Sequence, residues 1–191
     1  MDNTLLRHSF IYSAAAKFGF EKEMLEIVTT QNNPFIRTKQ IARLLKGKNI
    51  SELLKLADEI PVTDNTQAVI DTLKENGFIV GIMSDSYDCI VNHLKNKFSF
   101  DFSLGNELEF SKSVATGEIK IPSFYLPHEE SICNHEYCKT HALTHICKKF
   151  NVPVSDTLAI GDSENDICII KKACIGISFC SPVVIVFNWI I

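Results

Sequence analysis

The chain has 191 residues, of which 46% are hydrophobic and 22% are charged, and its formal net charge is −4 at pH 7. These values are typical of a globular domain and exclude a disordered chain, a collagen-like repeat and a small disulfide scaffold. The length fits one domain of ordinary size, with or without a smaller insertion. Because the net charge is negative, the sequence argues against a nucleic-acid partner.

The cysteine content and the N-terminus both favour a cytoplasmic protein. The seven cysteines are an odd number and lack the spacing of a disulfide framework, as expected in a reducing compartment. Asp2, Arg7 and His8 interrupt the basic and apolar regions that a signal peptide needs, so none is expected.

The first third of the chain, residues 5–60, has a helical pattern throughout. Apolar residues recur at helical spacing from Phe10, and Gly19 supplies a stop. Two more helices follow, the second opening at Pro34, and Ser51 is expected to cap a short fourth helix. This segment is therefore predicted to be a small helical bundle.

Beyond Pro61 the pattern changes to alternating helices and buried strands. Asp64 is the expected cap of a helix that stops at Gly77, and the continuous apolar run 78–83 is of strand length. Further apolar runs of strand length lie at 98–104, 157–161 and 174–179. Helices separate these runs, so the fold class is α/β, with a Rossmann-like parallel sheet and helices on both faces.

Polar residues follow two of these strands directly. Ser84, Asp85 and Ser86 come after the run 78–83, and an acidic cluster at 162–166 comes after the run 157–161. In parallel sheets the carboxyl ends of the strands bind ligands, and clustered carboxylates suit a hard cation such as Mg²⁺. The alternative is a helix start capped by Asp and Ser.

Several of these features resemble one known family. Residues 161–166, Gly-Asp-Ser-Glu-Asn-Asp, resemble the GDxxND motif of haloacid dehalogenase (HAD) superfamily phosphatases, in particular the phosphoserine-phosphatase-like branch. Ser84 resembles the family's phosphate-binding Ser or Thr, and Lys139 resembles the lysine that has the same role throughout the family. Asn106 and the stretch 116–118 resemble the hairpin that precedes that lysine.

The resemblance implies a domain organisation and a reaction. It divides the chain into a HAD-like core, residues 1–5 and 61–191, and a helical cap, residues 6–60. The implied function is Mg²⁺-dependent hydrolysis of a small phosphorylated metabolite through a covalent aspartyl-phosphate. No nucleic-acid or membrane partner is implied.

The resemblance also implies a set of site residues. The catalytic residues would be Asp2, as the general acid, and Lys139. The substrate would be bound by Ser84, Asp85, Lys139 and Asn165. Mg²⁺ would be bound by the backbone carbonyl of Asp2 together with Asp162 and Asp166.

The first motif of the family, DxDxT, is incomplete. Residues 1–6, Met-Asp-Asn-Thr-Leu-Leu, resemble this motif from its second position onward, followed by two leucines. The nucleophilic Asp, which is the first residue of the motif, would therefore lie one residue before Met1. We expect an N-terminal truncation; the alternative is a plain N-terminus with a helix cap. Loss of the strand that ends at the nucleophile would leave a gap of about 10 Å in the sheet, so we expect this chain alone to be unstable.

The substrate clamp of phosphoserine phosphatases is not reproduced. Where that branch has a Glu and a cap Arg that grip the substrate carboxylate, this chain has Ser9 and Ile41, with Arg37 and Arg43 at other helical phases. These two arginines are interpreted as solvated cap residues; the alternative is that either reaches an anionic group from a different angle.

Ligand-type residues also gather ahead of and within the predicted helix that follows Lys139. They are His128, Cys133, His135, Cys138, His141, His145 and Cys147. Such a density suggests a structural zinc site, and the alternative is a polar helix face with semi-buried cysteines. The spacing Cys133-x4-Cys138-Lys139 is similar to that in phosphoethanolamine and phosphocholine phosphatases of the same superfamily.

The last segment, residues 173–191, carries no charge and approaches the length of a membrane span. Its content of Ile and Val with Gly176, Pro182 and Asn188 favours a strand, a loop and a strand over a tail anchor.

Two functions outside catalysis remain as alternatives. One is a HAD-fold relic or binding protein that has lost the nucleophile, and the other is an interaction module held together by zinc.

Overall fold

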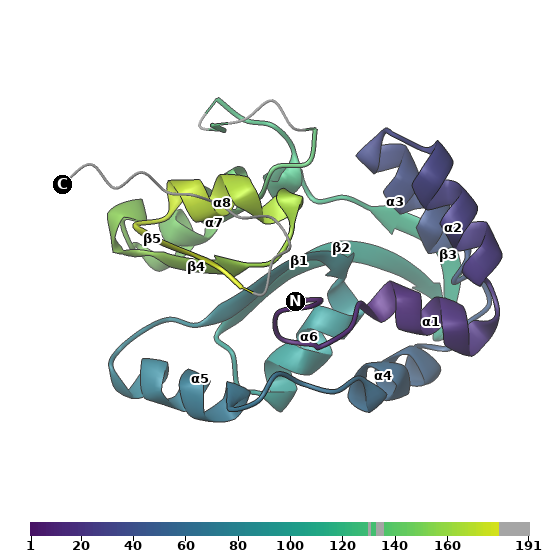
Figure 1. The fold of residues 1–191 in the computed structure, drawn as a ribbon, viewed down its shortest axis with the longest axis horizontal. Helices are drawn as coiled ribbons and strands as arrows, with labels where there is room; N and C mark the ends of the chain where they lie inside the picture. The colour runs from purple at the N-terminus through teal and green to yellow at the C-terminus, as the bar shows by residue number, and fades with distance from the viewer. Residues whose placement is uncertain (130, 133–135, 180–191) are drawn as a thin grey trace. The chain divides into compact units, whose positions relative to one another are not determined.

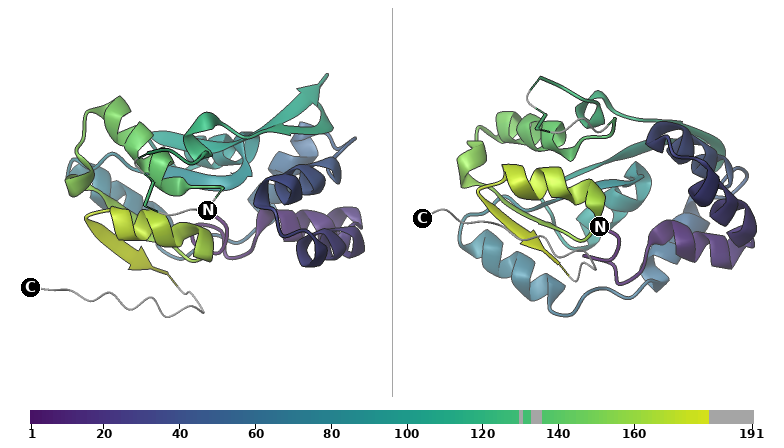
Figure 2. Two further views of the ribbon diagram at one scale, coloured as in Figure 1. Left: turned by 90° about the horizontal axis from the view of Figure 1, so that it is seen from above. Right: turned by 45° about the horizontal axis from the view of Figure 1, so that its top comes forward.

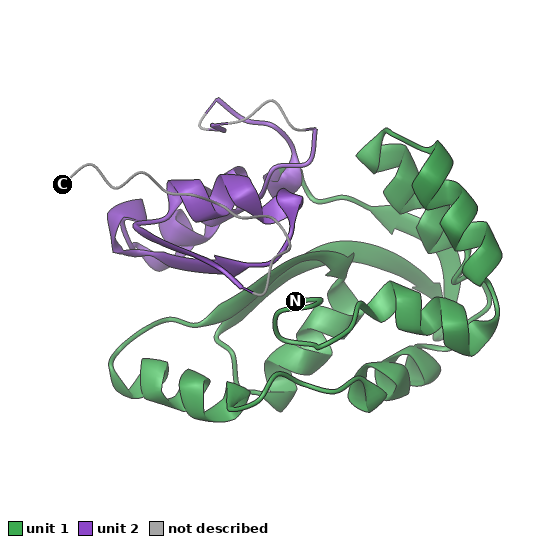
Figure 3. Ribbon diagram, in the orientation of Figure 1, with its two compact units in different colours: residues 1–123 green, residues 124–191 purple. Residues whose placement is uncertain are grey.

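The computed structural model describes residues 1–129, 131–132 and 136–179. The chain forms two compact units, residues 1–123 and 124–191 (Figure 3). Unit 1 contains the helices α1 (Phe10–Phe18), α2 (Glu21–Thr30), α3 (Pro34–Arg43), α4 (Ile50–Glu59), α5 (Thr66–Glu75) and α6 (Asp88–Lys97), and the strands β1 (Gly81–Tyr87), β2 (Phe102–Ser111) and β3 (Val114–Lys120) (Figure 1). Unit 2 contains α7 (Lys139–Phe150), β4 (Leu158–Gly161), α8 (Ile167–Lys172) and β5 (Ile175–Ser178), with the short 3-10 helices η2 (Val154–Asp156) and η3 (Glu164–Asp166); η1 (Ser123–Tyr125) crosses the boundary.

The helical start of unit 1 follows the predicted pattern. Gly19 ends α1 in the left-handed conformation, with φ of 77°, and its N–H donates to the Ala15 carbonyl at 2.8 Å. Pro34 opens α3, where the Asn33 side chain accepts a hydrogen bond from the Ile36 N–H at 3.1 Å. The apolar faces of α1 and α4 contribute to the unit 1 core, in which Phe10 is fully buried.

Two predicted helix caps are wrong, each by one or two residues. Asn49, rather than Ser51, caps α4: its side chain accepts from the Ser51 N–H, and the Glu52 carboxylate accepts from the Asn49 N–H, both at 2.9 Å. Asn65, rather than Asp64, precedes α5, and Asp64 forms an ion pair with Arg7 at 2.5 Å.

The sheet of unit 1 has the order β1-β2-β3, with β1 parallel to β2 and β2 antiparallel to β3. The antiparallel pair is the hairpin expected from the sequence. The first strand, however, begins at Gly81 instead of residue 78, and the Phe78 N–H donates back to the Leu73 carbonyl of α5 at 3.0 Å. The second strand covers 102–111 instead of 98–104, because residues 98–100 close the end of α6: the N–H groups of Phe98 and Phe100 donate to the Leu94 and Lys95 carbonyls, both at 3.0 Å.

Backbone hydrogen bonds join the helical segment to the rest of unit 1 at two places, in addition to the ion pair between Asp58 of α4 and Lys97 of α6. The hairpin meets the α3–α4 connection, where the Ala115 N–H donates to the Lys48 carbonyl and the Gly47 N–H to the Ala115 carbonyl, at 2.8 and 2.9 Å. The two ends of the segment also meet, since the Arg7 N–H donates to the Pro61 carbonyl at 2.8 Å. Backbone bonds therefore hold this segment in the unit.

Unit 2 is a parallel pair of strands covered by helices on one side. Strands β4 and β5 pair in register from Leu158↔Ile175 to Gly161↔Ser178. Helix α8 lies directly over them (Figures 1 and 2), and a Cβ at Gly176 would come within 2.2 Å of the Ile170 carbonyl oxygen. Only glycine permits this close approach of helix to strand.

The α/β class with parallel strands is confirmed, while the division into a core (1–5 and 61–191) and a cap (6–60) stays a prediction. The last part of the expected strand-loop-strand segment, residues 180–191, lies outside the described residues. Over the part of the chain that is described, no helix has both the length and the apolar character to cross a membrane.

Replacing the α4 cap tests the corrected assignment. We expect Asn49→Ala to lower the free energy of unfolding by about 1 kcal/mol, because the Ser51 N–H and the Ser51 hydroxyl lose their common acceptor, Asn49 Oδ1. Ser51→Ala, at the position first expected to be the cap, should cost less, because its hydroxyl makes one exposed hydrogen bond. Urea denaturation followed by circular dichroism measures both, and equal losses would contradict the assignment.

Candidate active site

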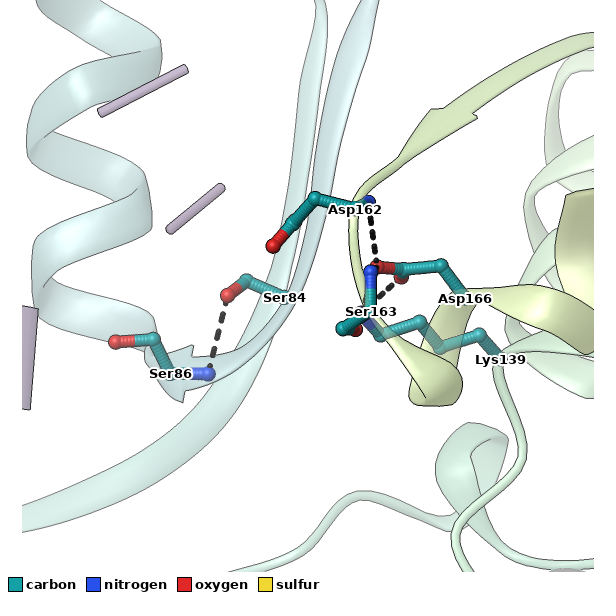
Figure 4. Close-up of polar contacts among 6 residues, drawn as sticks. All are labelled: Ser84, Ser86, Lys139, Asp162, Ser163 and Asp166. Atoms are coloured by element: carbon teal, nitrogen blue, oxygen red, sulfur yellow. Dashed lines mark hydrogen bonds and ion pairs between the residues drawn. The ribbon is translucent and has the colours of Figure 1, made fainter. Parts of the chain in front are cut away.

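The first group of candidate residues lies in the second half of strand β1. Ser84 is buried, and its Oγ accepts a hydrogen bond from the Ser86 N–H at 3.1 Å (Figure 4). Asp85 is exposed, and its carbonyl accepts from the Nδ2 amide of the fully buried Asn106 at 2.6 Å. The strand pairing is irregular between Met83 and Tyr87. The result is a fixed polar stretch at the carboxyl end of a parallel strand, which holds the Ser84 hydroxyl in place.

The residues packed beside this polar stretch are mainly apolar. Tyr87 is buried, and its ring meets Phe10 edge to face, with centroids 6.0 Å apart. Burial raises the pKa of the Tyr87 hydroxyl far above its ordinary value, so this group stays neutral. The neighbouring Cys89 thiol is likewise held neutral, because burial raises its pKa to about 12. Neither group is activated as a nucleophile.

Asp2 lies in a tight turn at the start of unit 1. The Met1 carbonyl accepts from the N–H groups of Leu5 and Leu6 at 2.9 and 3.0 Å. The Asp2 Oδ1 accepts from the Phe10 N–H at 3.1 Å, which places the carboxylate at the N-terminus of α1. A carboxylate is stabilised there by the unpaired N–H groups and the helix dipole.

The second group of candidates lies in unit 2, where a buried ion pair joins α7 to the turn after β4. The Lys139 Nζ donates to Asp166 Oδ1 at 2.6 Å, and the two side chains are 6% and 11% exposed. The other Asp166 oxygen, Oδ2, accepts from the Ser163 hydroxyl at 2.7 Å and from the backbone N–H groups of Ser163 and Asp162 at 3.2 and 3.3 Å (Figure 4). Both carboxylate oxygens are thus engaged.

The protonation state of Asp166 follows from these contacts. Burial raises its pKa, but the charge and hydrogen bond of Lys139 and the hydrogen bond of Ser163 outweigh burial and lower the pKa to about 2. Asp166 is therefore ionised near neutral pH and holds the lysine ammonium in place.

Ser163 is a site residue that sequence reasoning missed. With Asp166 it forms a capping box at the start of η3, in which each side chain receives a hydrogen bond from the other residue's backbone N–H. The pattern Ser-x-x-Asp is the signal for such a box, and it was readable in residues 163–166.

Asp162 and Asn165 stand on either side of Ser163 in the same turn. Asp162, the first residue after β4, is partly exposed, and Asn165 is exposed. Carboxylate oxygens are the ligands Mg²⁺ prefers, and this ion commonly binds one or two carboxylates with its other positions filled by water and phosphate. The Asp162 carboxylate fits such a site. The predicted metal role of Asp166 stays a prediction, as do the predicted roles of Asp2, Ser84, Asp85, Lys139 and Asn165.

The suggested zinc residues are engaged in other ways where they are described. The His141 ring stacks on His128, with centroids 4.4 Å apart, and the His145 ring stacks on Phe124 at 5.2 Å. Among the described residues no three His, Cys, Asp or Glu side chains are grouped for a metal. Cys133 and His135 lie outside this part of the chain, so the zinc site stays a prediction.

Comparison with known proteins identifies the relatives of this chain. Residues 1–173 match the family of haloacid dehalogenase-like hydrolases. A phosphoserine phosphatase of Methanocaldococcus jannaschii is 29% identical over 184 residues, which cover 94% of this chain and 82% of that protein. A phosphoserine phosphatase of Archaeoglobus fulgidus is 27% identical over 183 residues, and the chain spans only half of its length.

Solved structures show the same fold. The structure described as a phospho-aspartyl intermediate analogue of phosphoserine phosphatase matches with a TM-score of 0.77 and 28% identity, over 95% of this chain and 84% of that one. A HAD family hydrolase from Salmonella enterica serovar Typhi matches with a TM-score of 0.82 over 95% of this chain and 61% of that one. At 20% identity, the second match supports the fold alone.

Removing the lysine tests the ion pair. In Lys139→Met the Asp166 carboxylate stays buried without its cation, so we expect a loss of about 3–5 kcal/mol in unfolding free energy. The double variant Lys139→Met/Asp166→Asn removes that unpaired charge and should recover part of the loss. Lys171→Met, at an exposed position, is the control. Denaturant melts in the presence of EDTA measure all three, and equal stability of Lys139→Met and Lys171→Met would contradict the pair's role.

The same pair fixes a pH dependence. Because the Asp166 pKa is lowered from 3.8 to about 2, its contribution to stability is fully present above pH 3.8 and is lost as the pH falls toward 2. In the double variant this part of the acid-induced loss should be absent.

Proposed function

Because the chain belongs to the haloacid dehalogenase-like hydrolases, we propose that it hydrolyses a small phosphomonoester with Mg²⁺ through an aspartyl-phosphate. The observation that carries the proposal is the buried Lys139–Asp166 pair beside Asp162. An ammonium group fixed by an ionised carboxylate, next to a further carboxylate at the end of a parallel strand, suits the binding of phosphate together with a divalent cation.

The proposed roles follow the chemistry of each side chain. Lys139 neutralises charge that develops on the phosphoryl oxygens, and the Ser84 hydroxyl donates a hydrogen bond to one of them. Asp85 and Asn165 complete the substrate contacts. Asp162, with the Asp2 carbonyl and the Asp166 carboxylate, would hold Mg²⁺, which when bound supplies positive charge to the phosphoryl group.

The covalent step needs a nucleophile, which we assign to the position directly before Met1. Its carboxylate oxygen bonds to phosphorus while the ester P–O bond breaks, and Asp2 gives its proton to the leaving oxygen. Asp2 then takes a proton from water, whose oxygen attacks phosphorus, releasing inorganic phosphate and restoring the aspartate. The bond from the Phe10 N–H, which holds the Asp2 carboxylate at the start of α1, supports this proposed role.

The substrate class is a small phosphorylated metabolite. Two relatives are named phosphoserine phosphatases. In this chain Ser9 and Ile41 supply no charge where that branch uses its clamp, so the proposal does not single out phosphoserine. Phosphoserine, phosphoethanolamine and phosphocholine form a suitable assay panel. They share the phosphomonoester group and differ in the charged groups of the alcohol to which the phosphate is bound.

Extending the chain tests the assigned nucleophile. A version in which Asp precedes Met1, led by five apolar residues, should release phosphate from a member of the panel when Mg²⁺ is present and lose this activity in EDTA. The same extension with Asn in place of that Asp, and the 191-residue chain, should be inactive, because neither offers the attacking carboxylate. Activity of the Asn version equal to that of the Asp version would contradict the mechanism, and inactivity of all three would favour a non-catalytic binding protein.

The phosphate-binding role of Ser84 has its own test in the extended chain. We expect Ser84→Ala to lower kcat/KM by about 10²-fold, the typical cost of losing a donor to a developing charge. Ser103→Ala is a matched control, because Ser103 lies on the neighbouring strand and its hydroxyl bonds only to the exposed Asn92 side chain. An equal effect of the two substitutions on phosphate release would exclude Ser84 from the site.

A further inference from the structure

The Ser163 hydroxyl is bonded to Asp166 in both directions. Its Oγ accepts a hydrogen bond from the Asp166 N–H, and its proton is donated to Asp166 Oδ2 at 2.7 Å (Figure 4). A hydroxyl has a single proton, so the bond that it accepts and the bond that it donates together define its orientation. The hydroxyl therefore acts on the Asp166 carboxylate as well as capping the turn.

This bond is the shortest of those described at Asp166 Oδ2. The same oxygen accepts from the N–H groups of Asp162 and Ser163 at 3.3 and 3.2 Å, which are longer distances. The rotation of an Asp carboxylate about its Cβ–Cγ bond has broad minima, so its hydrogen bonds decide how it is turned. Ser163 thus supplies the closest contact that fixes this rotation.

The backbone of β4 confines the same carboxylate. A Cβ at Gly161 would lie 2.4 Å from the Asp166 Cβ and 2.8 Å from its Oδ2, so the Asp166 side chain rests directly against the glycine. Gly161 limits how far the carboxylate can move toward β4, whereas the Ser163 hydroxyl limits how it rotates.

The position of Lys139 depends on this carboxylate. Lysine carries its ammonium group on a flexible four-carbon chain, and the Lys139 Nζ donates to Asp166 Oδ1 at 2.6 Å. The two oxygens of a carboxylate lie in one rigid plane, so a bond that fixes Oδ2 also fixes Oδ1. The hydroxyl of Ser163 therefore influences where the ammonium lies.

We propose that Ser163 is a positioning residue for the phosphatase reaction: its hydroxyl turns the Asp166 carboxylate so that the Lys139 ammonium meets the phosphoryl oxygens. This inference rests on the proposed function, in which Lys139 neutralises charge that develops on those oxygens. Such an interaction is sensitive to position, since a displacement of about 1 Å can cost about 10²-fold in rate. Residue 163 is one of the two unspecified positions of GDxxND, so the role belongs to chains with a hydroxyl there.

The kinetics of the extended chain, with Asp before Met1, test this role. We expect Ser163→Ala to lower kcat about tenfold and to change KM by less than about twofold, because the lost interaction is stronger in the transition state. Ser163→Thr keeps the hydroxyl and should restore kcat. Ser155→Ala is the matched control, because the Ser155 hydroxyl donates to the exposed Asp156 carboxylate in the same unit, and it should leave both constants unchanged.

A second background shows whether Ser163 acts through the lysine. In Lys139→Met/Asp166→Asn, which buries no unpaired charge, adding Ser163→Ala should lower kcat/KM no further. An equal loss in both backgrounds overturns the proposal, because the hydroxyl would then act on the substrate or Mg²⁺ directly. If circular dichroism shows Ser163→Ala to be unfolded, Ser163→Gly replaces it, since glycine is tolerated at helix N-caps.

Nuclear magnetic resonance of ¹⁵N-labelled lysine gives a readout that needs no activity. An ammonium held in a buried ion pair exchanges its protons slowly and gives a ¹H–¹⁵Nζ signal, and Lys139→Arg identifies that of Lys139. We expect this signal to persist in Ser163→Thr and Ser155→Ala and to broaden in Ser163→Ala. Inactivity of the extended chain overturns the proposed function, whereas an unchanged signal in Ser163→Ala, or none in the unmodified chain, overturns the positioning role itself.

Discussion

The ion pair between Lys139 and Asp166 is the contact on which the candidate site of unit 2 depends. It joins the first residue of α7 to the turn after β4, across 27 positions of sequence. A buried pair of this kind adds little net stability compared with apolar residues, but neither partner can be lost without leaving an unpaired buried charge. Ser163 and two backbone N–H groups donate to the second carboxylate oxygen, so both oxygens of Asp166 are held within the turn.

The site residues of unit 1 are held by a different kind of contact. Ser84 belongs to the strand itself, and its hydroxyl accepts from the Ser86 N–H where the pairing of β1 with β2 is irregular. Asn106 on β2 holds the same stretch through the Asp85 carbonyl. Here one hydrogen bond within β1 and one between β1 and β2, rather than an ion pair, hold the polar groups.

Sequence patterns predicted the elements better than their boundaries. Apolar spacing and the stops at Gly19 and Gly77 located helices correctly, because these signals are local. The boundaries at residues 78 and 98 failed because the N–H groups of Phe78 and Phe98 donate back to carbonyls of the preceding helices instead of to a strand. Similarly, α5 begins after Asn65, and Asp64 pairs with Arg7. An apolar run marks a buried segment, but it does not mark where the helix before it ends.

For the candidate site, the sequence predicted the motifs but not the contacts between distant residues. The turn 161–166 and the hydroxyl at residue 84 were recognisable as motifs. That Lys139 pairs with Asp166 was not, because it depends on how α7 and β4 are packed, and that packing brings together residues from distant parts of the sequence. Ser163, by contrast, was missed although its capping pattern is local.

The bonds between the two ends of the helical segment have a consequence for how this chain can vary. Arg7 and Pro61 are backbone neighbours, and Leu6 pairs with Val62, so the 53 residues from 8 to 60 begin and end at almost the same point of unit 1. A segment joined to a fold in this way can change in length without pulling apart the strands that it interrupts. Its inner face is less free to change, because Phe10 packs against Tyr87, Asp58 pairs with Lys97 of α6, and the α3–α4 connection is bonded to the hairpin. Variation at least cost to the fold is therefore expected on the helix faces that point away from these contacts.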